Sequence, residues 1–97
     1  MAKVILTPQA RDDLNEIDGF SIENFGEAVA TEYMQGFFAA FARLSEYPES
    51  APLLPRITPP TRSLAYRSHR IIHDYQNDRV LIIRILHHTR DVRLALG

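Results

Sequence analysis

An apolar segment near the carboxyl end, RVLIIRIL at residues 79–86, constrains the fold of this 97-residue chain more than any other feature. It is rich in β-branched residues, and burial of each such side chain contributes about 1.5–3 kcal/mol, so we expect a strand in the centre of a sheet. Because side chains alternate along a strand, we assign one set to the helix-facing core: Leu81, Ile83 and Ile85. The opposite face then carries Val80, Ile82, Arg84 and Leu86.

The first half of the chain predicts a strand followed by two helices. KVIL at residues 3–6 is typical of a short strand, and Thr7 with Pro8 supplies the N-cap and first residue of a helix. Apolar residues spaced by three and four positions continue this helix to Gly26, a natural C-terminal stop. A second helix should extend over residues 27–46 and end before the next proline.

The second predicted helix has two adjacent apolar stripes, more than one contact face requires. One stripe comprises Val29, Tyr33, Phe37, Phe41 and Leu44. The other comprises Ala30, Met34, Phe38 and Ala42. Two interpretations follow: the helix packs against both the first helix and the sheet, or Met34 and Phe38 form an exposed patch that a partner covers.

The second half predicts a loop and an antiparallel meander. Residues 48–61 hold five of the six prolines and should be irregular. Strands are expected at residues 62–67, 70–75 and 79–86. A two-residue turn at Asn77-Asp78 would place Ile71, His73 and Tyr75 on the same face as Arg84.

These elements define the predicted fold class. We expect one α+β domain over residues 1–97 with the order βααβββ, in which a helical hairpin packs on one face of a mainly antiparallel sheet. The chain has no cysteine, which excludes disulfides and thiolate metal sites, and we expect no metal and no cofactor. Its apolar runs are too short for a signal peptide or a membrane span, so we expect a cytoplasmic protein that does not bind membranes.

Charge is distributed unequally between the two halves. Residues 1–49 contain nine acidic side chains and three basic ones, whereas residues 50–97 contain eight arginines and three acids, together with all four histidines. An anionic partner should therefore prefer the C-terminal half. Ten of the eleven cations are arginine, which suits planar, bidentate contacts with carboxylate or phosphate.

Four segments together resemble the RelE/ParE toxin superfamily of toxin-antitoxin modules. They are ARDDLNEI at 10–17, RLSEYP at 43–48, HRIIHDY at 69–75 and VLIIRILHHTRD at 80–91. Each motif is degenerate, but their order and spacing extend over nearly the whole chain. The resemblance implies a βααβββ fold, an antitoxin encoded beside the toxin, and growth arrest when the antitoxin is lost.

The two arms of this superfamily differ in chemistry. RelE-like members cut messenger RNA on the ribosome, which requires proton transfer and stabilisation of a pentavalent phosphate. The residues available for such a site are His87, His88, Arg67 and Arg84. ParE-like members block DNA gyrase by binding and need no catalytic residue.

Two features favour the ParE-like arm. RelE-like cutters are typically very basic and often use lysines near the cleft, whereas this chain has only Lys3. ParE-like members commonly end the last strand in a histidine followed by Arg-Asp, similar to HHTRD at 87–91. We therefore predict a ParE-like gyrase inhibitor without enzymatic activity and without sequence-specific DNA binding. The alternatives are a RelE-like ribonuclease and a non-toxic relative that only binds an antitoxin.

The resemblance also implies a ParD-like antitoxin that wraps the toxin with an amphipathic helix and an extended segment. We predict that Met34 and Phe38 offer the groove for the helix. Acidic antitoxin side chains would bind Arg62, Arg67 and Arg84. Arg84 lies among apolar neighbours and needs an acceptor, either from the C-terminal tail or from an incoming acidic chain. We assign target binding to Arg90 and Arg93, although Arg90 could instead simply pair with Asp91.

Overall fold

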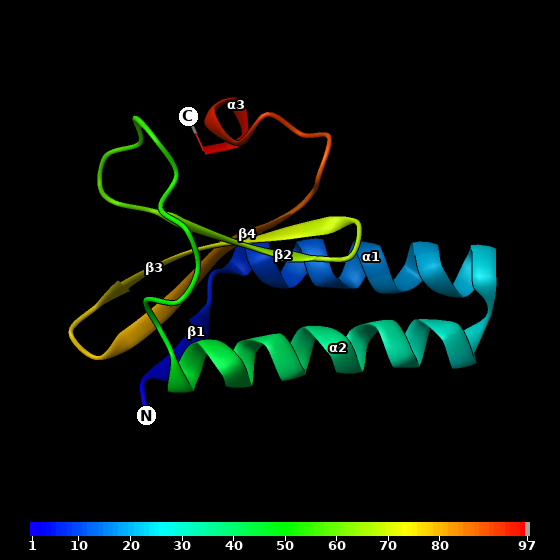
Figure 1. Cartoon of the computed structure of the whole chain (residues 1–97). Helices are drawn as coiled ribbons and strands as arrows, with labels where there is room; N and C mark the ends of the chain where they lie inside the picture. The colour runs from blue at the N-terminus through cyan, green and yellow to red at the C-terminus, as the bar shows by residue number, and fades with distance from the viewer. Residues whose placement is uncertain (97) are drawn as a thin grey trace.

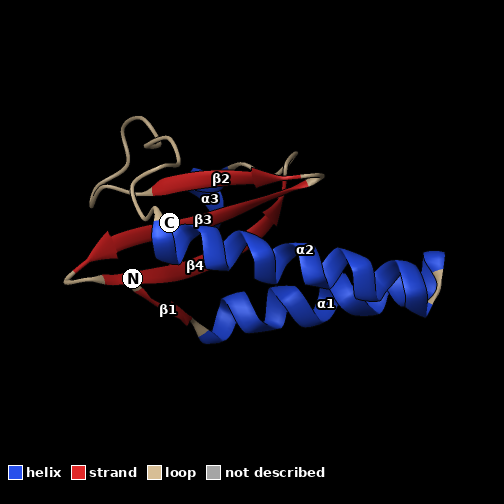
Figure 2. Cartoon of the chain, turned by 60° about the horizontal axis from the view of Figure 1, so that its bottom comes forward, coloured by secondary structure: helices blue, strands red, loops and turns tan. Residues whose placement is uncertain are grey.

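The computed structural model describes residues 1–96 and contains the predicted order of elements, followed by one further short helix. The elements are β1 (Lys3–Leu6), α1 (Pro8–Phe25), α2 (Glu27–Glu46), β2 (Arg62–Tyr66), β3 (His69–Gln76), β4 (Arg79–His87) and α3 (Val92–Leu96). The sheet has the order β1-β4-β3-β2; β1 is parallel to β4, and the other pairs are antiparallel. The α1–α2 hairpin covers one face of the sheet, and α3 lies beyond the other face (Figures 1 and 2). The α+β prediction is therefore confirmed, and α3 is the element that it lacked.

The boundaries of the hairpin follow from local chemistry. The Thr7 hydroxyl caps α1 by accepting a hydrogen bond from Ala10 N at 3.1 Å, and Pro8 occupies the first turn, where its missing N–H is not needed. Gly26 ends α1 with a φ of 87°, a conformation that side chains with a Cβ rarely adopt, and its N–H donates to Ile22 O. Both predicted helix boundaries at this glycine are confirmed.

Helix α2 uses its first stripe mainly for the core. Phe37, Phe41 and Leu44 are buried against the sheet and α1, but Val29 at the start of the helix is half exposed. In the second stripe Met34 is half-buried, whereas Phe38 is 56% exposed. The helix therefore packs on both neighbours and still leaves part of an apolar face open.

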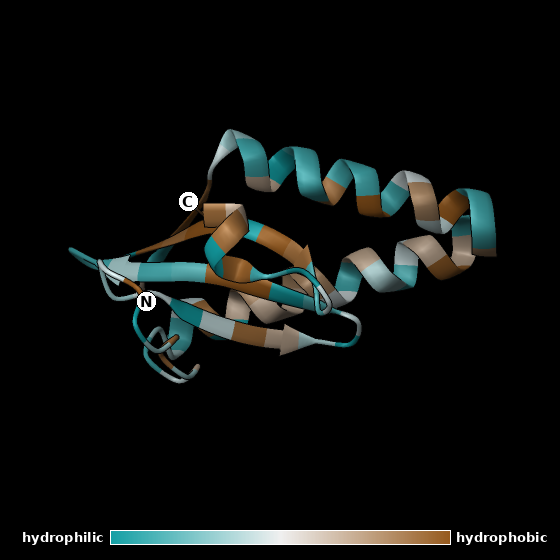
Figure 3. Ribbon diagram, turned by 90° about the horizontal axis from the view of Figure 1, so that it is seen from above, coloured by the Kyte–Doolittle hydropathy of each residue, from teal (hydrophilic) through white to brown (hydrophobic). Residues whose placement is uncertain are grey.

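Two cores lie on the two faces of the sheet. The larger one joins both helices to Ile71, Val80, Ile82 and Ile85, and the smaller one joins Ile72, Leu86 and Val92 under α3. Apolar colour follows the central strands and α3 in Figure 3. Burial on both faces explains why β4 is apolar at almost every position.

The predicted facing of β4 is wrong at two of its three core positions. Val80 and Ile82 face the helices with Ile85, while Leu81 and Ile83 are only partly buried. Alternation could not reveal which face carries the hairpin, because both faces are covered. In addition, His73 pairs with Ile82 but Ile72 pairs with Arg84, so Ile83 is an extra residue that shifts the alternation.

The predicted β3–β4 turn is confirmed. Asn77 and Asp78 both have positive φ, as two-residue hairpin turns require, and Tyr75 pairs with Val80. The expectation that Ile71, His73 and Tyr75 share a face with Arg84 is wrong. The extra residue at Ile83 pairs Arg84 with Ile72, whereas the three predicted residues pair with helix-facing positions of β4, namely Ile85, Ile82 and Val80.

Helix α1 completes the hydrogen bonding of β4 where β1 ends. Strand β1 pairs with β4 only as far as Ile82. From there the Thr7 hydroxyl donates to Ile83 O at 2.7 Å, and the Asp13 carboxylate accepts from Ile85 N at 2.9 Å. Asp13 thus supplies a hydrogen-bond acceptor that a longer β1 would otherwise provide to β4.

The same carboxylate binds Arg84. Arg84 Nε and Nη2 donate to the two oxygens of Asp13 at 2.8 and 3.0 Å, a bidentate pair that is largely shielded from solvent. Hydrogen bonding to Asp13 raises the pKa of Arg84 above its ordinary value. The predicted acceptor was wrong: it is neither the C-terminal tail nor an incoming chain, but the first helix.

Replacing Asp13 should destabilise the fold strongly. Asp13→Ala leaves the Arg84 guanidinium and the Ile85 N–H without their acceptor, so we expect a loss of about 2–4 kcal/mol in the free energy of unfolding. Urea denaturation followed by circular dichroism measures it. The exposed neighbour provides the control, since Asp12→Ala should change stability by less than about 0.5 kcal/mol. Equal effects of the two substitutions would contradict this role.

Buried His73 should make the fold sensitive to acid. Its side chain is fully buried with Nε2 unpartnered, and burial lowers its pKa below the ordinary 6.5. The neutral ring is thus favoured on folding, so its stabilisation is complete above pH 6.5 and declines as pH falls through and below that value. We expect the decline to reach at most about 1.4 kcal/mol per pH unit. Urea denaturation between pH 7 and about 5 should show a flatter profile for His73→Leu, with exposed His88→Gln behaving like the unmodified chain.

Candidate functional site

The residues predicted to form the antitoxin groove line a cavity on the helical side of the molecule. Met34 and Phe38 line a cavity of about 480 Å³ between α1, α2 and β1, which we call the helical groove. Its other lining residues are Val4, Leu6, Arg11, Leu14, Asn15 and Phe41. Met34 lies half-buried in it, and Phe38 is largely exposed. Mostly apolar walls with a few polar groups suit an amphipathic helix.

A second apolar cavity lies at the free end of the hairpin and was not predicted. It measures about 560 Å³, and Phe20, Phe25 and Val29 on its lining are 62%, 62% and 49% exposed. Figures 1 and 2 show the hairpin extending beyond the sheet at this end. Sequence periodicity assigned these side chains to helix faces but could not reveal that the sheet ends before it covers them.

Aromatic and histidine side chains lie where this end meets the sheet. Tyr33 Oη and His69 Nδ1 are 2.7 Å apart, and the His69 and His87 rings lie 5.5 Å apart. Burial, together with the neighbouring charges of His87 and His88, lowers the pKa of His69, so its ring is mainly neutral at pH 7. Burial also raises the pKa of Tyr33.

The predicted anchors for acidic side chains have different surroundings. Arg62 is mostly buried and donates to Glu49 O and Ala51 O at 3.0 and 2.7 Å, so it ties the proline-rich loop to β2. Arg67 is exposed, and its guanidinium lies 5.8 Å from the ring centres of both Tyr33 and Tyr66. Arg84 is held by Asp13, as described above. Among the three, Arg67 is the side chain most open to a partner.

Close packing fixes the tyrosines beneath Arg67. Tyr66 lies directly against Gly36, where any Cβ would overlap its hydroxyl and ring, and its hydroxyl donates to Tyr33 O at 2.9 Å. The Tyr33 and Tyr66 ring centres are 5.1 Å apart. Arg67 therefore lies over a rigid aromatic platform.

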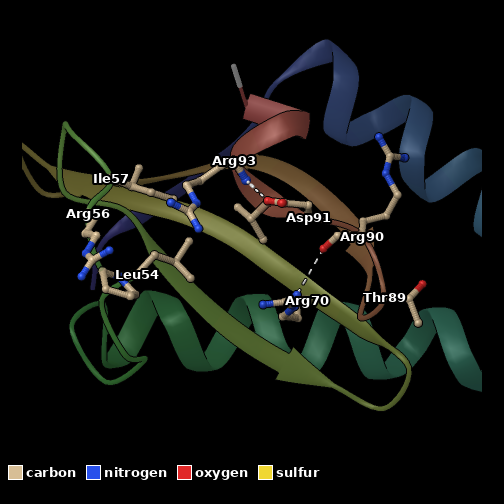
Figure 4. A pocket seen from close by; sticks show the side chains of 10 residues that line it. Leu54, Arg56, Ile57, Arg70, Thr89, Arg90, Asp91 and Arg93 are labelled. Atoms are coloured by element: carbon tan, nitrogen blue, oxygen red, sulfur yellow. Dashed lines mark hydrogen bonds between the residues drawn. The ribbon is translucent and has the colours of Figure 1, made fainter.

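The predicted target-binding arginines lie beside a third cavity, under α3. It measures about 570 Å³, and we call it the arginine pocket. Its lining comprises Leu54, Pro55, Arg56, Ile57, Arg70, Thr89, Arg90, Asp91, Val92 and Arg93. The Arg93 side chain lies across it, whereas that of Arg90 extends away from the others (Figure 4).

The side chains of the alternative ribonuclease site have separate partners. Arg84 pairs with Asp13, Arg67 lies over the tyrosines, and His87 Nδ1 is 2.8 Å from Thr89 Oγ1. His88 is exposed and stacks near His87, with ring centres 4.5 Å apart. Within residues 1–96 no three His, Asp or Glu side chains are placed to hold a metal ion, and no helix of that part is long and apolar enough to cross a membrane.

The family model of the ParE toxin of type II toxin-antitoxin systems, parDE, matches residues 4–92. The chain belongs to the ParE toxin family. The match includes α1, α2, β1 from its second residue, the other three strands and the first residue of α3. The predicted ParE-like arm of the superfamily is thereby confirmed, and the chain is a ParE-like toxin of a ParDE system.

One solved structure shows the same fold. The ParE chain resembles a chain of the chromosomal ParDE toxin-antitoxin system from P. aeruginosa with a TM-score of 0.77, at 19% identity, over 90% of this chain and 96% of that one. A conserved hypothetical protein from Helicobacter pylori matches over 93% of this chain and 98% of its own at 16% identity, with a TM-score of 0.38. No curated protein matches the sequence.

Proposed function

We propose that this ParE chain arrests growth by binding DNA gyrase and that a ParD-like antitoxin neutralises it in the cytoplasm. The observation that carries the proposal is the family match over residues 4–92. The solved ParDE system from P. aeruginosa has the same fold, which supports an antitoxin partner of the ParD kind.

The helical groove supports the antitoxin part of the proposal. Phe38 exposes more than half of its surface at the groove, a position at which a partner helix would gain apolar burial. Arg11 and Asn15 on the same lining supply polar contacts at the rim. Arg67, exposed over its tyrosine platform, is the arginine best placed to receive an acidic side chain of the extended antitoxin segment.

The distribution of charge supports a binding function on the other layer. The acids of the first half belong mainly to α1 and α2, whereas Arg90 and Arg93 lie on the layer beyond the sheet. Target and antitoxin contacts thus have different electrostatic character. We retain Arg90 and Arg93 as the proposed gyrase contacts.

A binding mechanism also fits the surroundings of the histidines. RNA cleavage would need a proton-transfer group and cations directed at one phosphate. Arg84 is already neutralised by Asp13 in a bidentate pair, and breaking that pair to reach a phosphate would cost several kcal/mol. These contacts favour a gyrase-binding toxin over the ribonuclease alternative.

Phe38 should be a major contact of the antitoxin. Phe38→Ala removes the most exposed apolar side chain of the helical groove, so we expect the affinity for the cognate antitoxin to fall at least about tenfold. Phe25→Ala is the matched control, because Phe25 is equally large and exposed but lines the other hairpin cavity. Calorimetric titration measures the affinity of each variant for the antitoxin. If Phe38→Ala and the unmodified chain bind the antitoxin equally well, the helical groove is not the antitoxin site.

Gyrase should be the target. Added to a supercoiling reaction, the chain should block supercoiling, and antitoxin added first should restore it. Replacing Arg90 and Arg93 together with glutamine should weaken the inhibition, since both proposed contacts lose their charge. A parallel ribosome-dependent RNA cleavage assay distinguishes the alternatives. Cleavage of RNA would indicate a ribonuclease, and a lack of activity in both assays would indicate a non-toxic relative.

A further inference from the structure

The arginine pocket brings together cations from three separate parts of the chain. Arg56 comes from the proline-rich loop, Arg70 from β3 and Arg93 from α3, and their side chains surround one cavity of about 570 Å³ (Figure 4). Like charges on one lining repel one another, and an anion in the cavity would reduce that repulsion.

Acidic side chains in the described part of the chain do not neutralise these cations. Asp91 is the one acid on the lining, and its Oδ1 accepts a hydrogen bond from the backbone N–H of Arg93 at 2.9 Å. The salt bridges within residues 1–96 involve Arg62, Arg67 and Arg84, not the pocket arginines. The pocket therefore keeps a net positive charge.

Arg70 shapes the pocket from beneath. Its Nη2 donates to His88 O and Arg90 O at 3.1 and 3.3 Å and so fixes the turn that leads into α3 (Figure 4). Its Nε is buried and has no hydrogen-bond partner among the described residues. Because this nitrogen has almost no accessible surface, a ligand in the cavity would meet the positive charge of Arg70 rather than this donor.

The loop holds Arg56 in an unfavourable backbone conformation. Its φ is 61°, in the left-handed region that residues with long side chains seldom occupy. Such strain concentrates at ligand-binding positions, where the fold maintains it. Here it places a guanidinium beside the pocket opposite α3 (Figure 4).

One part of the lining is apolar. Leu54 and Ile57 of the loop are half-buried, Val92 of α3 is buried, and all three pack with the smaller core. A ligand that fits this pocket therefore combines an anionic group with a flat or apolar one. The cavity volume lies within the range of pockets for small organic ligands.

We propose that the arginine pocket binds a nucleotide, with its phosphates on Arg56, Arg70 and Arg93 and its base against the loop. Guanidinium groups that approach from three directions match the several oxygens of a phosphate better than the two coplanar oxygens of one carboxylate. Guanidinium planes also stack on bases. The site is separate from the helical groove and its use does not depend on gyrase being the target.

Calorimetric titration of the full chain tests the proposal with ATP, GTP, inorganic phosphate and adenosine as probes. We expect saturable binding of both nucleotides below about 1 mM, weaker binding of inorganic phosphate and none of adenosine. Arg56→Gln and Arg93→Gln should each weaken nucleotide binding about tenfold, because each removes a charge-assisted contact.

Arg43→Gln is the matched control. It removes the same charge from an exposed arginine of α2, which is not on the lining of the pocket, so nucleotide binding should be nearly unchanged. Circular dichroism verifies that each variant is folded. Absence of saturable binding, equal losses in all three variants, or equal affinities for phosphate and ATP would overturn the proposal. Tighter binding of a glutamate-rich peptide than of ATP would also overturn it and would assign the pocket to an acidic protein segment.

Discussion

The carboxylate of Asp13 is the contact on which the arrangement of helix and sheet depends. Strand β1 is too short to pair with the whole of β4, and the remaining edge would expose unpaired backbone groups next to the core. Asp13 binds Ile85 N and the Arg84 guanidinium at once, so it closes that edge and fixes α1 along it. Because Gly26 joins α2 directly to α1, the position of the whole hairpin follows from this contact.

The covering of both sheet faces explains where the functional surfaces lie. The hairpin extends past the end of the sheet, which leaves the apolar cavity at its free end, and the helical groove lies between α1, α2 and β1 (Figure 2). On the other face, α3 and the proline-rich loop cover only the small core of Ile72, Leu86 and Val92. The arginine pocket lies between α3 and the proline-rich loop.

The parts of the fold that local chemistry determines could be predicted from the sequence. The parts of the site where distant segments meet could not. The Thr7 cap, the Gly26 stop and the Asn77-Asp78 turn each act within a few residues, so their sequence signals are direct. The partner of Arg84 depends on packing between segments 71 residues apart, and the extra residue at Ile83 depends on how β4 pairs with β3. Met34 and Phe38 were found by helical spacing, whereas the hairpin-end cavity depends on where the sheet ends.

The separation of acidic and basic layers has a consequence for how two partners share one small toxin. The helical groove is lined by α1, α2 and β1, whereas the arginine pocket is lined by the proline-rich loop, β3 and α3. Helix α3 lies on the opposite side of the sheet from the hairpin (Figure 2). The proposed antitoxin helix in the groove would therefore leave the pocket open, and a further antitoxin segment would have to pass around a sheet edge to cover it. Strand β2 forms one of the two edges, and exposed Arg67 lies directly after it, so an acidic segment that took this route would meet a cation.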